Sequence, residues 1–208
     1  MTTVVIPVVW AMTLAGCRPD GERAAARPDP ATLPNIVLVT LDTVRADHCS
    51  CYGYGRDTTP RMDAVARQGV LFEKAYAVMP TTGPSHATLF TSLYPDQHGV
   101  RRNAQTLANG VTTLAEILRA NGYETAAFVS SFALERRFGM AQGFETYDDD
   151  FRGADCSVRA LGAGEWEMLP RGEEFDRRAK ETTARAVKWV EKRSGRSPFF
   201  LWVHYFDP

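Results

Sequence analysis

The sequence has few cysteines, no long apolar run and no excess of charge of either sign. It contains four cysteines in 208 residues, and its 24 basic and 25 acidic residues give a formal net charge of −1. The absence of a run of about 18 apolar residues excludes a conventional membrane-spanning helix. The balanced charge gives no overall field for nucleic acid, so we expect no nucleic-acid partner. With 44% hydrophobic and 24% charged residues, the composition is that of a globular protein with one sizeable core.

The first seventeen residues have the pattern of a lipoprotein-type signal peptide. Val4 to Leu14 is almost wholly apolar, and Leu14-Ala15-Gly16-Cys17 precedes an abrupt change to polar residues. This apolar core is too short to span a bilayer but suits a signal peptide. The string resembles a bacterial lipobox, although no Lys or Arg precedes it. We predict a cell-envelope lipoprotein anchored to the membrane through lipidated Cys17 and facing the periplasm or exterior. The alternative is a short hydrophobic leader or an ordinary buried segment.

Cysteine does not organise the predicted fold. If Cys17 is lipidated, Cys49, Cys51 and Cys156 remain, which is an odd number in a compartment that permits disulfides. Cys49 and Cys51 are too close for an easy disulfide with each other, and no second pair of ligands completes a structural zinc site. We therefore expect both to be small residues that face the core.

The order of predicted elements indicates an α/β fold with a largely parallel sheet sandwiched by helices. Residues 18–33 are rich in proline and lack apolar periodicity, so they predict a flexible linker. The runs Ile36–Leu41 and Phe199–Phe206 predict strands that are covered on both faces. Capping and punctuating residues predict helices over residues 60–68, from Thr112 or Thr113 to 120, and over 174–193, with extended segments at 70–77 and 125–130.

Two aspartates follow the predicted strands directly. Asp42 comes after the first apolar run and Asp207 after the last. Ligands of parallel α/β sheets bind at the carboxyl ends of the strands, so this edge is the place to expect chemistry. The alternative for each aspartate is that it only starts a turn.

A short helix is predicted after Thr82. Pro84 suits the first helical position, and Leu89, Phe90 and Leu93 would form the apolar face. Thr82 would then lie just before the helix N-terminus, where free amides and the positive end of the helix dipole stabilise an anion such as sulfate or phosphate. The alternative is that Thr82 is only a helix cap.

Three separated segments together resemble the sulfatase family. The first is P-N-I-V-L-V-T-L-D-T-V-R-A-D (residues 34–47) followed by C-Y-G (51–53), the second is Thr59-Pro60 with residues 84–100, and the third is residues 198–208. The resemblance implies an alkaline phosphatase-like fold, incomplete at the C-terminus, with residues 34–208 as the N-terminal portion of a truncated catalytic domain. It implies an enzyme that cleaves a sulfate ester, or a related phosphate ester, of a small molecule or glycan by in-line attack of a metal-activated nucleophile. We expect this 208-residue chain alone to be inactive and poorly folded.

The resemblance places Asp42 at the family's first metal-binding aspartate. The ion there is usually Ca²⁺, for which a carboxylate is the expected ligand, and Zn²⁺ or Mn²⁺ are alternatives. Many sulfatases carry two successive aspartates at this point, whereas this sequence continues with Thr43.

The family signature C/S-x-P-x-R aligns with residues 82–86, Thr-Gly-Pro-Ser-His. Thr82 therefore stands at the nucleophile and His86 at the usual arginine. Sulfatases convert the Cys or Ser to formylglycine, which is not expected from a threonine; related nucleotide pyrophosphatases/phosphodiesterases use an unmodified threonine. His86 would orient the nucleophile or carry a proton, or would only cap or pack the helix.

This sequence also departs from the sulfatase pattern at residues 127–132, which favours two alternative functions. Many sulfatases supply a Lys and a His to the sulfate where this chain has Ala-Phe-Val-Ser-Ser-Phe at residues 127–132. The alternatives are therefore a phosphodiester or phosphonate hydrolase that uses Thr82 as its unmodified nucleophile, and a non-catalytic binding lipoprotein with a degenerate sulfatase fold.

Three polar features are weaker candidates. His98 lies in a turn after the predicted helix, and His204 lies inside the last strand, where histidines more often have structural roles. Asp148-Asp149-Asp150 has no other residues in metal-ligand spacing around it, so we predict a solvated turn.

Overall fold

A computed structural model describes residues 32–152, 176–195 and 197–207. Their centre is a four-stranded sheet in the order β1-β4-β2-β3, and each neighbouring pair is parallel. The strands are β1 (Ile36–Leu41), β2 (Glu124–Phe128), β3 (Thr146–Asp148) and β4 (Phe199–Tyr205). The predicted α/β class with a parallel sheet is confirmed.

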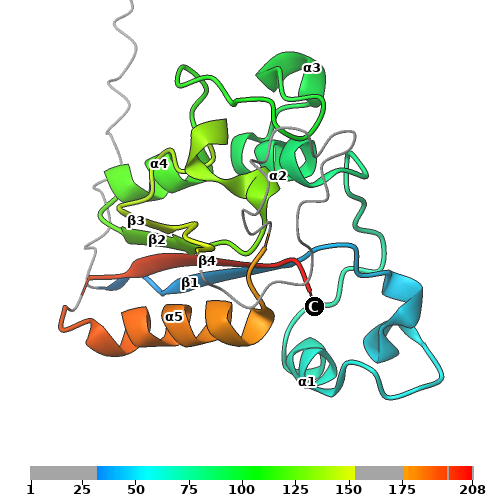
Figure 1. Ribbon diagram of the computed structural model, residues 1–208. Coiled ribbons are helices and arrows are strands. Elements are labelled where there is room, and N and C mark those ends of the chain that lie inside the picture. The colour runs from blue at the N-terminus through cyan, green and yellow to red at the C-terminus, as the bar shows by residue number, and fades with distance from the viewer. Residues whose placement is uncertain (1–31, 153–175, 196, 208) are drawn as a thin grey trace, which may run out of the picture.

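Helices cover both faces of the sheet. Figure 1 shows α2 (Thr82–Thr91), α3 (Pro95–His98) and α4 (Leu114–Ala120) on one side and α5 (Ala179–Lys192) on the other. The helix α1 (Pro60–Gln68) lies beyond the β1 edge, near the single-turn helices Ala46–His48 and Ser50–Tyr52. Two more single-turn helices, Phe132–Leu134 and Arg136–Phe138, follow β2 and precede β3 in the sequence.

Strand β4 divides the interior into two apolar cores. Its even-numbered residues Phe200 and Trp202 belong to the core under α2 and α4, and its odd-numbered Leu201 and Val203 belong to the core that faces α5. This alternation follows from the two-residue side-chain period of a strand. The prediction that this strand is covered on both faces is confirmed.

The same prediction is wrong for β1. Val37 and Val39 are 57% and 50% exposed, although Ile36 and Leu38 pack against the larger core. The strand stands last in the sheet order, and a hollow of about 520 Å³ separates its outer face from Val65 of α1. An apolar run alone does not distinguish a strand with two covered faces from one with a single covered face.

The capping signals located the helices well. Thr113 caps α4 by accepting the Glu116 N–H at 3.2 Å, while the Glu116 carboxylate accepts the Thr113 N–H at 2.8 Å. Asn121 follows α4, and Gly122 then adopts a left-handed φ of 87°. Both the predicted start and the predicted end of this helix are confirmed.

One predicted extended segment and the start of one predicted helix are wrong. Residues 70–77 form no strand and do not join the sheet; Val70, Phe72 and Tyr76 are 79%, 71% and 84% exposed, so their apolar side chains are not packed in a core. Helix α5 begins at Ala179, since the Asp207 carboxylate accepts the Ala179 N–H at 2.8 Å and fixes that end. The first residues of the predicted helix, 174 and 175, lie outside the described part of the chain.

The predicted signal peptide, the lipidation site at Cys17 and nearly all of the predicted linker also lie outside the described residues. Within them, no helix combines the length and the apolar character needed to cross a bilayer. Cys49 is buried, as predicted, and Cys51 is half-buried; both are free thiols.

Candidate active site

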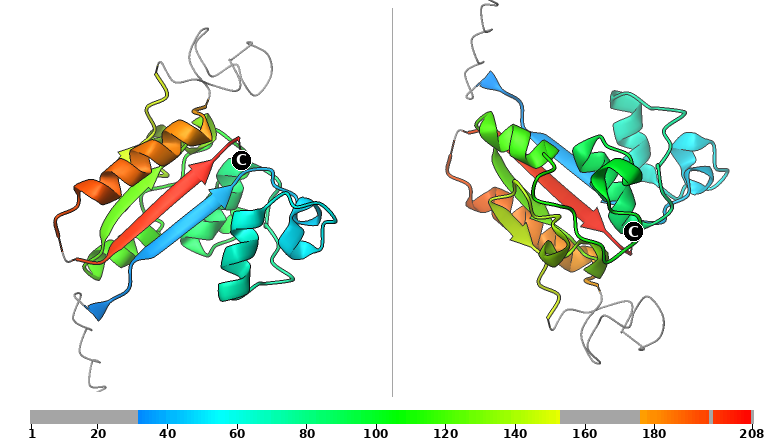
Figure 2. Two further views of the ribbon diagram at one scale, coloured as in Figure 1. Left: turned by 90° about the horizontal axis from the view of Figure 1, so that it is seen from below. Right: turned by 90° about the horizontal axis from the view of Figure 1, so that it is seen from above.

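Asp42 and Thr82 meet at the carboxyl edge of the sheet. Figure 2 shows β1 and β4 side by side with their arrows pointing the same way, toward this edge. The Asp42 N–H donates to the Tyr205 carbonyl at 2.9 Å, which continues the β1–β4 pairing one residue past β1. The Thr82 hydroxyl donates to Asp42 Oδ2 at 2.8 Å. The fold thus joins two predicted site residues that are 40 positions apart.

Thr82 is the first residue of α2, so the helix begins two positions earlier than the sequence predicted. Pro84 is therefore its third residue, and Leu89 is 45% exposed, whereas Ala87 and Phe90 are buried. The Gly83 N–H donates to the Asn103 side chain at 2.8 Å, and Pro84 has no N–H. Two of the first amide positions of α2 are therefore unavailable to an anion, and the helix dipole remains as the favourable contribution.

A cavity of about 260 Å³ opens at this edge, with Asp42, Thr43, Thr81, Thr82, Ser85 and His86 in its wall. Thr43 has a φ of 57°, a left-handed conformation that is strained for a β-branched residue. Backbone strain of this kind is concentrated at functional sites. A larger hollow of about 460 Å³ lies between α1 and the start of α5, but no carboxylate or histidine is among the described residues that line it.

His86 is buried, and both of its ring nitrogens have partners. Nδ1 lies 2.8 Å from the Thr82 carbonyl, and Nε2 lies 3.1 Å from the Thr40 hydroxyl. Because a carbonyl only accepts, Nδ1 carries the proton; the Trp202 indole N–H donates to Thr40 Oγ1, which leaves the hydroxyl hydrogen of Thr40 for Nε2. Burial lowers the pKa of His86 to about 4, so the ring is neutral. Of the roles considered, this geometry favours orienting the Thr82 backbone over carrying a proton.

His204 lies closer to the site than its sequence position suggested. It pairs with Thr40 across β1 and β4, and its Nε2 lies 3.5 Å from Asp42 Oδ2. Its ring meets that of His86 edge to face at a centroid distance of 5.0 Å. The even-residue alternation of β4, which places His204 on the same face as Trp202, is the sequence signal that could have identified it.

Asp42 is an ionised carboxylate at neutral pH. Burial by itself would raise the pKa of Asp42, but the adjacent His204 imidazole and the Thr82 hydroxyl outweigh burial and hold the pKa below its usual value. Among the described residues, no Lys or Arg forms an ion pair with it. The carboxylate is thus a negative charge, half-buried and held by hydroxyl and imidazole groups.

Two other candidates have structural roles. The Asp207 carboxylate binds the start of α5 at Ala179. His98 is buried, and its Nε2 lies 3.0 Å from the Thr88 hydroxyl while its Nδ1 accepts the Val100 N–H at 3.1 Å. The sequence expectation of a structural histidine is confirmed for His98.

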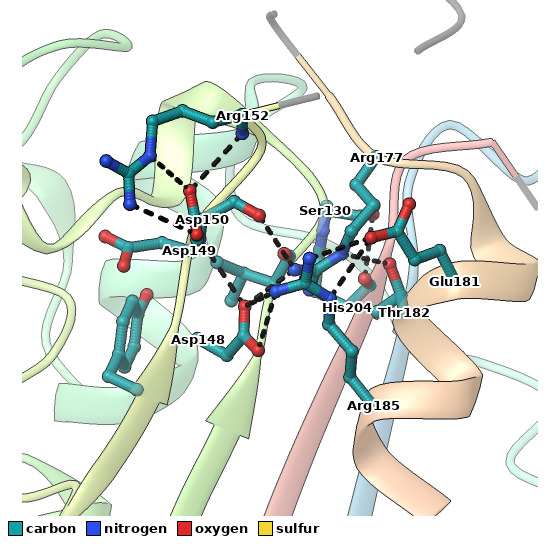
Figure 3. Close-up of polar contacts among 12 residues, drawn as sticks. Ser130, Asp148, Asp149, Asp150, Arg152, Arg177, Glu181, Thr182, Arg185 and His204 are labelled. Atoms are coloured by element: carbon teal, nitrogen blue, oxygen red, sulfur yellow. Dashed lines mark hydrogen bonds and ion pairs between the residues drawn. The ribbon is translucent and has the colours of Figure 1, made fainter. Parts of the chain in front are cut away.

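The acidic run at residues 148–150 is solvated only at Asp150, which is exposed and pairs with Arg152, two residues further along the chain. Asp148 accepts hydrogen bonds from the completely buried Arg177 at 2.6 Å and from Arg185 at 3.3 Å (Figure 3). Asp149 forms a 2.6 Å ion pair with Arg136. The arginine partners come from other parts of the chain, which no local pattern around the aspartates reveals. The prediction was wrong for Asp148 and Asp149 because residues distant in the sequence supply their arginine partners.

A divalent cation fits Asp42 as one of several ligands. The carboxylate can give at most two of the six to eight oxygens that Ca²⁺ takes. No group of three or more His, Cys, Asp or Glu side chains in the described residues could hold a metal ion. The described residues therefore supply only part of a coordination sphere.

Comparison with known proteins decides the family. The sequence model of the Sulfatase family matches residues 34–208. This chain belongs to the sulfatase family. It is 27% identical to an N-acetylglucosamine-6-O-sulfatase of Bacteroides thetaiotaomicron over 217 residues, which cover 100% of this chain and 35% of that protein. It is also 27% identical to the human N-acetylgalactosamine-6-sulfatase, with 97% of this chain and 44% of the relative covered.

Solved structures show the same fold. A protein crystallised with its substrate D-glucosamine-2-N,6-O-disulfate superposes with a TM-score of 0.65 at 27% identity, over 84% of this chain and 34% of that chain. The phosphonate monoester hydrolase of Agrobacterium radiobacter superposes with a TM-score of 0.63 at 23% identity, over 85% and 41%. The predicted fold and family are confirmed. This chain spans 35% of the length of the bacterial relative and 44% of the length of the human relative.

Proposed function

We propose that the whole protein hydrolyses a sulfate ester or a related phosphate ester, with the unmodified Thr82 hydroxyl as nucleophile and Asp42 as one ligand of a divalent cation. The observation that carries this proposal is the 2.8 Å hydrogen bond from Thr82 Oγ1 to Asp42 Oδ2 in the wall of the 260 Å³ cavity. A bound cation would lower the pKa of the Thr82 hydroxyl and would stabilise negative charge on the ester group during the reaction.

The described residues support a division of roles. Asp42 Oδ2 accepts the Thr82 hydrogen, which directs the lone pairs of Oγ1 away from the carboxylate. His86 holds the Thr82 carbonyl through Nδ1–H, so the helix start that carries the hydroxyl stays in place. The positive end of α2 favours an anionic group at Thr82. Together these groups fit in-line attack on a tetrahedral anion.

The proposal includes two classes of substrate, sulfate esters and phosphate or phosphonate esters. The names of the relatives support an amino-sugar sulfate as the first substrate to test. Thr82 supports a phosphodiester or phosphonate instead, because a threonine cannot yield the formylglycine aldehyde of ordinary sulfatases. Glycan sulfates and small aryl esters both belong in the substrate panel.

A substrate panel tests the proposal. The whole protein, Thr82→Ala and Thr82→Ser are assayed on aryl sulfate, amino-sugar 6-sulfate, phosphomonoester, phosphodiester and phosphonate, each with Ca²⁺, Mn²⁺ or Zn²⁺. We expect turnover of at least one ester that needs metal, is lost in Thr82→Ala and is partly kept in Thr82→Ser. Full activity in Thr82→Ala excludes the nucleophile. No turnover with any metal favours the non-catalytic binding lipoprotein, which the absence of Lys and His at residues 127–132 supports.

We further propose that the protein is held in the cell envelope by acylation of Cys17. The support is the Leu14-Ala15-Gly16-Cys17 string after an apolar stretch. Cys17→Ser should move the protein to the soluble fraction or leave an unprocessed precursor. Unchanged fractionation, with no acyl label on the wild type, contradicts the anchor.

A further inference from the structure

The hollow between α1 and the start of α5, called here the α1–α5 hollow, adjoins the cavity of Asp42 and Thr82. Its volume is about 460 Å³, against about 260 Å³ for the active-site cavity. Leu41 and Val44 line both spaces, so residues 41–44 form their common wall. Small-molecule sites typically enclose about 300–1,000 Å³. A molecule bound at Thr82 therefore has a second space of ligand size beside it.

Most of the wall of the α1–α5 hollow is apolar. The apolar side chains come from β1, the turn that follows it, α1 and α5, and they are Leu41, Val44, Pro60, Met62 and Ala179. Among the described residues of this wall, Arg61 is the only charged one, and it is exposed. Such a wall favours a ligand that has apolar surface to remove from water.

The wall also contains four hydroxyl groups, and each donates its hydrogen within the protein. Thr183 donates to the Ala179 carbonyl at 2.7 Å, so the Tyr205 hydroxyl, 2.7 Å from Thr183 Oγ1, is the donor in that pair. The other two donations run from Thr58 Oγ1 to the His48 carbonyl at 2.6 Å and from Thr59 Oγ1 to Asp63 Oδ1 at 3.1 Å. The oxygens of a sugar would receive no hydrogen bond from these groups and would lose those that they receive from water.

We propose that the α1–α5 hollow binds the alcohol portion of the substrate, and that this alcohol is apolar and not a sugar. The inference rests on the proposed function, because it takes Thr82 as the place of the ester group. The ester lies in the smaller cavity, and the alcohol extends past Leu41 and Val44 into the hollow. The wall thereby selects the substrate by the polarity of its alcohol.

Binding to Thr82→Ala of the whole protein tests this subsite without turnover of the ligand. The probes are cyclohexylmethyl sulfate and glucose 6-sulfate, which share a ring, a methylene and a sulfate but differ in their hydroxyl groups. The matching pair of methylphosphonates covers the second ester class. Calorimetry measures the Kd of each probe with Ca²⁺, Mn²⁺ or Zn²⁺ present.

Two changes to the wall are each compared with a matched change outside it. Thr183→Trp fills the hollow, whereas Ala184→Trp adds the same side chain at the next exposed position of α5. Met62→Asn makes the wall polar, whereas Val65→Asn does the same at an exposed position of α1 that lies on the outer hollow beside β1. Circular dichroism checks that each variant is folded, and Met62→Asn decides if Thr183→Trp is not.

The cyclohexylmethyl ester should bind at least about tenfold more tightly than the glucose ester. Thr183→Trp and Met62→Asn should weaken the cyclohexylmethyl ester by at least about tenfold, and the two matched variants by less than threefold. Equal affinity of the two esters, or equal losses in wall and matched variants, overturns the subsite and leaves the proposed function intact. Full turnover by Thr82→Ala overturns the proposed function and this inference with it.

Discussion

Asp42 and Asp148 occupy equivalent places in the sheet but have opposite surroundings. Asp42 directly follows β1 and Asp148 ends β3, so both stand at the carboxyl edge, and their side chains are 11% and 19% exposed. Asp148 is paired with Arg177 and Arg185. Asp42 is held by a threonine hydroxyl and lies near an imidazole. The arginines neutralise the negative charge of Asp148. A carboxylate without such a partner keeps a negative charge that a cation can neutralise.

The same difference extends to the neighbours of each aspartate. Around Asp148, Arg177 also donates to the Val129 and Asp150 carbonyls and to the Thr182 hydroxyl. Around Asp42, the Thr81 hydroxyl has no hydrogen-bond partner in the described residues, and the buried His204 ring makes no hydrogen bond there beyond its 3.5 Å contact from Nε2 to Asp42 Oδ2. The hydrogen bonds around Asp148 therefore stabilise the fold at the β3 end of this edge. At the β1 end, polar groups around Asp42 can still bind a ligand.

The largest expected effect is the loss of turnover in Thr82→Ala. Because the hydroxyl is the proposed nucleophile, kcat on the best substrate should fall by at least about a thousandfold. Metal affinity and unfolding should stay close to wild type, since the side chain makes one hydrogen bond at a helix start. Thr81→Ala is the matched control and should change kcat by less than threefold; equal losses in the two variants would show that helix geometry, and not the hydroxyl, is responsible.

Arg177→Met should produce the largest loss of stability. It leaves the Asp148 carboxylate and three other acceptors short of a donor in the interior, which typically costs about 3–5 kcal/mol. Urea unfolding of the whole protein measures the change. Arg152→Met is the control, because the Arg152–Asp150 pair is exposed at the surface and should contribute little. Similar unfolding midpoints for the two variants would contradict a structural role for the buried arginine.

Two threonines at helix N-cap positions give the smallest predicted difference. Thr113 accepts the Glu116 N–H, so Thr113→Val should lower the free energy of unfolding by about 1 kcal/mol or more. Thr81 precedes α2 without any side-chain capping bond, and its buried hydroxyl has no partner among residues 32–152, 176–195 and 197–207. Thr81→Val should therefore leave stability unchanged or raise it slightly. A loss of the same size at both positions would mean that Thr81 has a partner that matters for folding.

Local patterns predicted the parts of this molecule whose causes are local. The β1 and β4 runs, the Thr113 cap and the end of α1 at Gln68 all follow from neighbouring residues. Asp42 and Thr82 were found because the strand end and the family signature each mark a position in the sequence. That they touch depends on the fold, which the family resemblance supplied.

The rest depended on residues distant in sequence. Arg177 lies 29 positions from Asp148, and no pattern around the acidic run predicts the ion pair. The two histidines differ because Thr40 bonds to His86 and not to His204, a distinction set by side-chain direction in the packed sheet. The exposed face of β1 likewise depends on which strand or helix lies beside it.

The most direct measurement compares Asp42→Asn with Asp148→Asn in the whole protein, using metal affinity and the free energy of unfolding of the metal-free form. Asp42→Asn should lose metal affinity by at least about a hundredfold and change stability by less than about 1 kcal/mol. Asp148→Asn should lower stability by about 2 kcal/mol or more and keep the metal affinity within about threefold. Wild-type metal affinity in Asp42→Asn, or its loss in a folded Asp148→Asn, would contradict the assignment of the active site to the β1 end of the sheet.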